Sequence, residues 1–186
     1  SIRKYRPDPV PPEALARVLQ AASLAPSGNN SQPWRFVVVT DAGIKKKLCE
    51  VSGNQEWIVE APVTVAVVGD ITAKIKEPLK PGATPSTEDP KHRAVLLKTL
   101  RDATIAADHL VLAAEDEGLG SCWIALFEQE DIKPVLAVPE NCYVVALVTI
   151  GFAAETPKHK PRLPLRETVF RDRYGRRFDE SELPCS

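Results

Sequence analysis

Two groups of polar residues are of types that bind a small polar ligand. The first group lies between Pro26 and Trp34 and consists of amide and hydroxyl side chains, namely Ser27, Asn29, Asn30, Ser31 and Gln32. Such side chains donate and accept hydrogen bonds, so they suit a heterocycle that carries alternating carbonyl and N–H groups. A capped turn would use the same residue types, and composition alone leaves both interpretations open.

The second group is cationic and comes from both ends of the chain. Arg3 lies near the start of the sequence, and Lys160 and Arg162 lie near its end. Because the planar guanidinium of arginine matches a phosphate, these three residues could gather round a phosphate group. The alternative interpretation is a solvated surface, since lysine and arginine are mostly exposed.

Composition narrows the class of protein. The chain has 186 residues, of which 44% are hydrophobic and 26% are charged, and its formal net charge is -1. These values are typical of one globular domain. A nearly neutral total argues against nucleic acid as a partner, because proteins that bind it usually carry a large basic excess.

The sequence carries no membrane or metal signal. Its longest apolar runs, 63–68 and 144–150, are far shorter than the roughly 20 residues that a transmembrane helix needs. The first residues lack the apolar core of a secretion signal, so we expect a cytoplasmic protein. The cysteines and histidines are scattered without metal-ligand spacing, and we expect free thiols and no metal site.

Apolar runs predict the strands that would position the polar groups. We expect buried strands at 35–40, 62–69 and 143–150, because these runs are β-branched, uninterrupted and bounded by turn residues. The last is the strongest strand signal in the chain. A further strand or strand end is expected at 121–127.

Helical periodicity predicts two main helices, at about 12–24 and 92–117. Short helices are expected after Asp41 and after Glu128, and Pro134 should shorten or distort the second of these because it lacks an amide donor. Strands that alternate with helices around one core imply a three-layer α/β or α+β domain.

The helix at 92–117 is apolar on several faces. Its main stripe consists of Leu97, Leu100, Thr104, Ala107, Val111 and Ala114, and the apolar surface extends to Ile105, Leu112 and Ala113. A helix of this kind must be central in the domain or packed against a partner chain. Residues 72–92 should form an exposed loop or short lid, and residues 155–186 should wrap the domain or a second subunit.

Several motifs resemble those of the nitroreductase family. Residues 26–34 resemble the family signature Pro-Ser-x-x-Asn-x-Gln-Pro-Trp, and residues 1–5 resemble the end of its opening element, Arg-Arg-Ser-x-Arg-x-Phe/Tyr. The segments at 53–55, 118–123 and 160–162 then follow in the family's order. The resemblance therefore spans nearly the whole chain, and its second motif is highly specific.

The resemblance implies one FMN-binding domain over 1–186, with 155–186 as a wrapping C-terminal extension. It implies a mixed α/β sheet flanked by helices and an intertwined homodimer that binds flavin at the subunit interface. One subunit would contact the flavin through Ser1, Arg3, Asn54, Lys160 and Arg162. The other would contribute the signature loop, with Pro26, Ser27, Gly28, Asn30 and Gln32. The backbone of Ala125 and Leu126 would lie beside the reactive ring nitrogen.

The resemblance also implies an activity. The family's enzymes would pass two electrons from NADH or NADPH through FMN to flat, electron-poor acceptors such as nitroaromatics or quinones, in a ping-pong cycle. No catalytic side chain is needed, because the cofactor carries the chemistry. A positive charge near the pyrimidine edge, assigned to Arg3, would stabilise negative charge on the reduced cofactor. Two alternatives stay open: a flavin-dependent dehydrogenase or dehalogenase of one specific metabolite, and a non-enzymatic flavin-binding sensor or storage protein.

Overall fold

The computed structural model describes residues 1–75 and 90–178. The chain divides into two compact units, Ser1–Thr156 and a C-terminal unit that begins at Pro157. Most of the loop or lid expected at 72–92 lies outside the described residues. On its two sides, Ile71–Lys74 form a short 3-10 helix, η2, and Pro90 begins a long helix.

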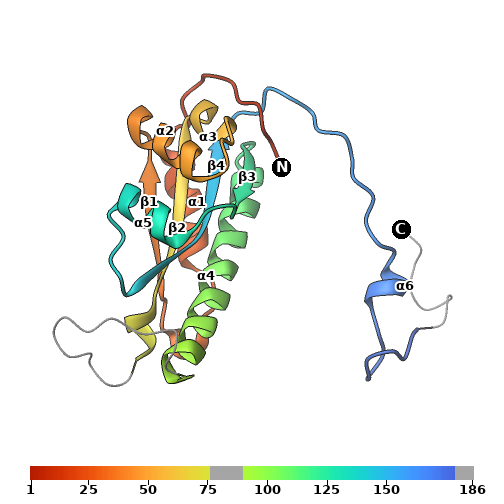
Figure 1. Ribbon diagram of the computed structural model, residues 1–186. Coiled ribbons are helices and arrows are strands. Elements are labelled where there is room, and N and C mark those ends of the chain that lie inside the picture. Colours follow the sequence, from red (N-terminus) through yellow and green to blue (C-terminus); the bar gives the residue numbers. More distant parts are fainter. Residues whose placement is uncertain (76–89, 179–186) are drawn as a thin grey trace. The chain divides into compact units, whose positions relative to one another are not determined.

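The first unit is built on a four-stranded sheet with the order β1-β2-β4-β3 (Figure 1). The strands are β1 (Trp34–Val39), β2 (Val63–Asp70), β3 (Gly120–Ile124) and β4 (Cys142–Gly151). All four lie where the apolar runs predicted them, with ends shifted by one to three residues. The central strands β2 and β4 are buried almost throughout, as expected of uninterrupted apolar runs.

Every strand pairing among the described residues is antiparallel, whereas the family resemblance implied a mixed sheet. The reason lies in the connections. The connection from β1 to β2 begins and ends at the same end of the sheet, so β2 returns in the opposite direction. Across the sheet, β1 and β4 run one way and β2 and β3 run the other, and the two directions alternate. The expected α+β class is confirmed.

Helices cover both faces of the sheet, which gives the expected three layers (Figure 1). On one face, α1 (Pro12–Ser23) and α4 (Pro90–Asp116) pack on Val63, Val65 and Val67. On the other face, α2 (Ala42–Val51), α3 (Trp57–Glu60) and α5 (Gln129–Leu136) pack on the alternate residues Ala66 and Val68. This division follows from the two-residue period of side chains along a strand.

Local signals explain the helix ends. The Asp41 carboxylate accepts a hydrogen bond from the Ile44 amide at 2.8 Å and caps α2. Pro134 lies inside the last turn of α5, which continues for two more residues and ends at Ala137 in the left-handed conformation, with φ 51°. The helix is short, as expected, but Pro134 does not terminate it. The four-residue helix α3 and the 3-10 turn η1 (Gly28–Asn30) were not predicted.

The apolar stripe identified along α4 is mostly not buried within this unit, which leaves open its packing against a partner chain. Of its six residues, only Ala107 and Ala114 are buried, and Leu97 is 57% exposed. The face that packs on the sheet and α1 is mostly small, with Ala103, Ala106, Ala107 and Ala114 around Leu110. Small residues occupy that face because they let the helix approach both neighbours closely. The larger apolar side chains are thereby left on the outside of the unit.

The C-terminal unit contains α6 (Leu165–Thr168) and a cluster of aromatic and arginine side chains. The rings of Phe170 and Tyr174 are in contact, with centroids 4.6 Å apart and planes tilted by 44°. The Arg177 guanidinium lies 5.4 Å from the Phe170 centroid. None of the described residues from Pro157 onward is buried. That this unit wraps a second subunit stays a prediction.

Candidate cofactor site

The N-terminal segment is fixed along the edge of the sheet. The Ile2 amide donates to the Ser121 carbonyl at 2.8 Å, and the Tyr5 hydroxyl donates to the Ile2 carbonyl at 2.9 Å. That hydroxyl is also 2.7 Å from Thr149 Oγ1. Burial raises the pKa of Tyr5, so its phenol stays neutral and keeps its proton for these bonds. Ile2 is thus held at both backbone groups, which positions Ser1 and Arg3 beside it.

Arg3 presents a positive charge to solvent. Its guanidinium lies 5.1 Å from the centroid of the Trp57 ring, within the range of a cation–π contact. Its backbone amide donates to Glu155 Oε1 at 2.6 Å, but its guanidinium has no carboxylate partner among residues 1–75 and 90–178. The charge is therefore held in place and available to an anionic ligand.

A tight turn between α2 and α3 carries Asn54 and meets Leu126. Gly53 and Asn54 both adopt positive φ, and the Asn54 amide donates to the Cys49 carbonyl at 2.9 Å. A Cβ on Gly53 would lie 2.9 Å from Leu126 Cδ2, so the exposed Leu126 lies directly against this turn. Ala125, also exposed, follows the end of β3. The structure thus brings Asn54 and Leu126 together.

Lys45 fixes the helix that carries Trp57. Its amino group is buried and donates to the carbonyls of Val59 at 3.2 Å and Ala61 at 2.8 Å. Burial lowers the pKa of this amine. Lys45 therefore ties α2 to the end of α3. Nearby, Trp57 Nε1 is buried without a hydrogen-bond partner in the described structure.

The signature loop between α1 and β1 is strongly bent. Asn29, Asn30 and Gln32 all adopt positive φ, between 43° and 56°. Within the loop, the backbone amide of Gln32 donates to Ser27 Oγ at 3.0 Å. The backbone amide of Gly28 donates to Asp102 Oδ2 of α4 at 2.9 Å and so fixes the loop to that helix. The side chains of Asn29 and Asn30 remain exposed, so their amides are available to a ligand.

These two groups of residues lie toward opposite ends of the sheet. The signature loop joins the C-terminal end of β2, where the Asp70 amide donates to the Pro33 carbonyl at 2.7 Å. Trp57, under Arg3, precedes the N-terminal end of β2 at Val63. The two ends are about 24 Å apart, because a strand rises by about 3.4 Å per residue.

One chain therefore brings together part of the predicted set and separates the rest. The first group contains Ser1, Arg3 and Asn54. Ala125 and Leu126 follow Ile124, which is level with Leu147 and Ala66, so these two residues lie nearer the middle of the sheet. The second group contains Pro26, Ser27, Gly28, Asn30 and Gln32. Lys160 and Arg162 belong to the C-terminal unit, and their part in the site stays a prediction.

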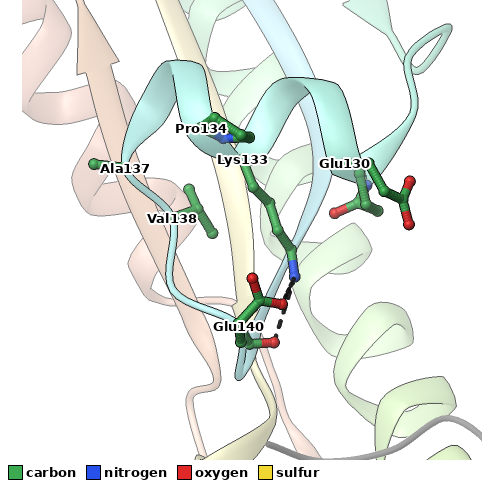
Figure 2. Close-up of a pocket in the computed structure, with 7 residues that line it drawn as sticks. Glu130, Lys133, Pro134, Ala137, Val138 and Glu140 are labelled. Atoms are coloured by element: carbon green, nitrogen blue, oxygen red, sulfur yellow. Dashed lines mark hydrogen bonds and ion pairs between the residues drawn. The ribbon is translucent and has the colours of Figure 1, made fainter.

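A small pocket of about 260 Å³ lies along α5 (Figure 2). Lys133 crosses it toward Glu140, with Nζ 3.3 Å from the Glu140 carbonyl oxygen and 3.7 Å from its Oε2. The pocket contains no predicted site residue, and its lysine is already paired. It offers little to a charged cofactor.

Comparison with known proteins identifies the family. A sequence profile described as "Nitroreductase; Nitroreductase family" matches residues 1–152. The chain belongs to the nitroreductase family. A Thermus thermophilus protein named NADH dehydrogenase is 35% identical, over 91% of this chain and 90% of its own length. A Bacillus subtilis FMN reductase is 32% identical, over 94% of this chain and 70% of its own.

A solved structure supports the same assignment. The NADPH:FMN oxidoreductase from Vibrio harveyi, complexed with NAD+, has a TM-score of 0.80 and 29% identity, covering 94% of this chain and 74% of its own. The nitroreductase profile covers the opening segment and the signature loop but ends before Lys160 and Arg162.

None of the helices described for this nitroreductase has the length and apolar character that a membrane span requires.

Proposed function

We propose that this nitroreductase binds FMN between two copies of the chain and passes two electrons from NADH or NADPH to a flat, electron-poor acceptor. The observation that carries the proposal is the separation of the two residue groups along β2. The ends of this strand are about 24 Å apart, and a separation of this size favours a site that combines the two groups from different chains. The names of the relatives, an FMN reductase and an NADPH:FMN oxidoreductase, support the choice of cofactor.

The residues present fit FMN. One side offers the fixed Arg3 guanidinium, the exposed Asn54 amide and an indole N–H at Trp57 that lacks a protein partner. These are donors, as the carbonyl oxygens of a pyrimidine edge require. The other side offers the exposed amides of the signature loop. We assign the phosphate to Lys160 and Arg162, together with Ser1.

When bound, FMN supplies the two-electron chemistry, and the protein supplies binding, orientation and charge. Arg3 stabilises negative charge at the pyrimidine edge, because its own charge has no acidic partner in the described structure. Asn54 orients that edge, and Leu126 provides an apolar surface beside it. No side chain needs to act as a nucleophile or a general base.

The overall reaction balances with one proton from solvent. NAD(P)H gives up a hydride and becomes NAD(P)+, and the two electrons with two protons convert a quinone to a hydroquinone. A nitroaromatic would instead give a nitroso compound and water. Donor and acceptor occupy the same open pocket in turn, which predicts ping-pong kinetics.

The surface of α4 supports a second copy as partner. Leu97 and Leu112 are each 57% exposed, and half-buried apolar side chains lie between them. A monomer would leave this apolar surface in water, whereas a homodimer interface would cover it. Size-exclusion chromatography with light scattering should therefore report a dimer.

The experiment that tests the function is anaerobic mixing of the purified protein with FMN and then with NADH or NADPH. We expect a flavin spectrum that bleaches with a nicotinamide and returns when a quinone is added. Arg3→Ala should weaken FMN retention at least tenfold. Arg6→Ala is the matched control, because Arg6 also stacks on an aromatic ring, at 4.8 Å from Phe152, but lies outside the site.

Two results would overturn the proposal. A protein that takes up no FMN contradicts the cofactor assignment. A bound flavin that bleaches with dithionite but with neither nicotinamide contradicts the reductase assignment and favours a sensor or storage role. Reduction by a nicotinamide with no turnover of quinones or nitroaromatics favours an enzyme of one specific metabolite.

A further inference from the structure

A second and larger pocket, of about 530 Å³, opens between the signature loop, η2 and α4. Its volume is in the range of pockets that hold small-molecule ligands. The polar side chains that line it are Asn29, Ser31, Lys74, Lys98, Arg101 and Asp102. Apart from Asn29, whose exposed amide belongs to the signature loop, the function proposed above uses none of these side chains.

The charges in this pocket do not cancel. Lys74 Nζ lies 2.6 Å from Asp102 Oδ2, and both side chains are about nine-tenths buried, so this pair is internally compensated. Lys98 and Arg101 are exposed, and neither has an ion-pair partner within the described part of the chain. They lie three residues apart on α4, which places them on one face of the helix. Among the residues that the structure describes, the pocket therefore carries two positive charges without an acidic partner.

Two neutral groups add to the cations. Ser31 Oγ is buried and has no hydrogen-bond partner in the described structure, although a buried hydroxyl normally has one. The Asn29 side chain is exposed beside it, on a left-handed backbone. A guanidinium fork, an ammonium group, a hydroxyl and an amide form a donor set that matches the oxygens of a phosphate. The pocket along α5 has no such set, because Lys133 is already paired with Glu140.

We infer that this pocket binds a phosphate group of the nicotinamide dinucleotide. The inference rests on the proposed function, which makes a nicotinamide the electron donor. Gly28 and Asn29 belong both to the pocket and to the signature loop, so a donor stacked beside the flavin would have its phosphate-bearing part within reach. Two phosphates have this chemistry: the 2′-phosphate of NADPH and the pyrophosphate that NADPH and NADH share.

The test is the double variant Lys98→Ala/Arg101→Ala, prepared as the FMN-loaded protein. Anaerobic flavin reduction is followed against the concentration of NADPH and of NADH. We expect at least a tenfold rise in the half-saturating concentration of NADPH, with the limiting rate unchanged. An unchanged value for NADH assigns the 2′-phosphate, and an equal rise for NADH assigns the pyrophosphate.

A matched control separates local binding from net charge. Lys46→Ala/Lys47→Ala removes the same two charges from an exposed face of α2, outside the pocket, and should leave both nicotinamides unaffected. If the two double variants change NADPH binding equally, or if neither changes it by more than twofold, the pocket does not bind the donor's phosphate.

A binding measurement separates this inference from the proposed function. Calorimetric titration of the protein with 2′,5′-ADP and with 5′-ADP reports on the pocket whether or not any flavin is reduced. Binding of either nucleotide that is lost in Lys98→Ala/Arg101→Ala and kept in the control supports the phosphate site. If the flavin is reduced by NADPH and neither nucleotide competes, the function stands and the phosphate site is wrong.

Discussion

Replacing Gly120 with alanine should disturb the candidate cofactor site through Ile2. A Cβ at position 120 would lie 2.6 Å from Ile2 Cγ1 and 3.1 Å from Ile2 Cβ. The second atom is attached to the backbone, so a change of rotamer cannot relieve the contact. Ordinary carbon–carbon contacts are about 3.5–4.0 Å, and Ile2 must therefore move by roughly 1 Å.

That movement has a cost that the structure allows us to estimate. The Ile2 amide and carbonyl are bonded to Ser121 at 2.8 Å and to the Tyr5 hydroxyl at 2.9 Å, and a displaced Ile2 strains both bonds. Overpacking costs about 1–3 kcal/mol, and a weakened hydrogen bond about 1 kcal/mol. We expect a loss of roughly 2–4 kcal/mol in the free energy of unfolding, measured by urea denaturation.

The same variant should bind FMN more weakly, because Ser1 and Arg3 flank Ile2. A hydrogen bond to a charged group contributes about 1.5–3 kcal/mol, which corresponds to a ten- to hundredfold increase in the Kd for FMN. The matched control is Gly118→Ala. Gly118 has φ 71°, and in the described structure no heavy atom lies within 4 Å of a Cβ placed there. Its replacement should cost about 1 kcal/mol of backbone strain and leave FMN binding unchanged.

The outcome that would refute this reasoning is a Gly120→Ala protein that unfolds like Gly118→Ala and binds FMN as tightly as the unmodified chain. Ile2 would then not position the residues beside it. A destabilised Gly120→Ala protein with unchanged FMN affinity would instead confirm the packing and remove Ser1 and Arg3 from the site.

Three further predictions concern other contacts. Tyr5→Phe removes a buried hydroxyl and should cost about 1–3 kcal/mol in urea denaturation, and no loss would mean that water replaces it. Asp102→Asn leaves the buried Lys74 amine without its counter-charge and should cost about 3–5 kcal/mol, whereas an unchanged urea midpoint would show that Lys74 reaches solvent. The Arg17 hydrogen bond lowers the pKa of Glu117 from its usual 4.5, so the stability that this carboxylate adds is present at neutral pH and is lost as the pH falls through the lowered pKa. The difference in urea midpoint between the unmodified chain and Glu117→Gln should therefore disappear in acid, and a difference that persists there contradicts the assignment.

The sequence predicts the strands well because their signals are local. The runs that form β2 and β4 are uninterrupted and apolar, and no other element buries such residues on both sides. The start of α2 is equally local, since Asp41 is of a type that favours the N-cap position, and its carboxylate accepts a hydrogen bond from the Ile44 amide. The predicted elements and the three-layer arrangement are accordingly correct.

The packing surface of α4 could not be read from apolarity alone. Periodicity favours the largest apolar side chains as the core face, but close packing against α1 and the sheet selects alanines. Lys45 is a second case in which residue type alone does not predict burial, because here a charged side chain is buried. A lysine is expected in water, and its burial depends on two carbonyls at the end of α3, those of Val59 and Ala61.

The candidate site was predicted in the parts that a motif defines. The signature loop, Arg3 and Asn54 were all predicted from the family resemblance. Trp57 carries no polar pattern, and its contact with Arg3 joins residues 54 positions apart. The close approach of Leu126 to Gly53 likewise depends on tertiary packing, although the glycine itself was a signal that something lies near its backbone.

The separation of the two residue groups makes a prediction that one variant alone cannot test. In a dimer whose sites each combine Arg3 of one chain with the signature loop of the other, Arg3→Ala damages both sites, and so does Asn30→Ala. When the two variants are co-expressed with different affinity tags, the heterodimer contains one site with both changes and one site with neither.

That heterodimer should therefore bind about one FMN per two chains with unmodified affinity, whereas each parent homodimer binds weakly at both sites. If each site were built within one chain, the heterodimer would carry one defect in every site and could not exceed its parents. Titration of the doubly tagged heterodimer with FMN distinguishes the two arrangements. A heterodimer no better than the stronger parent would show that Arg3 of one chain and the signature loop of the other do not combine in one site, and would remove the reason for a two-chain cofactor site.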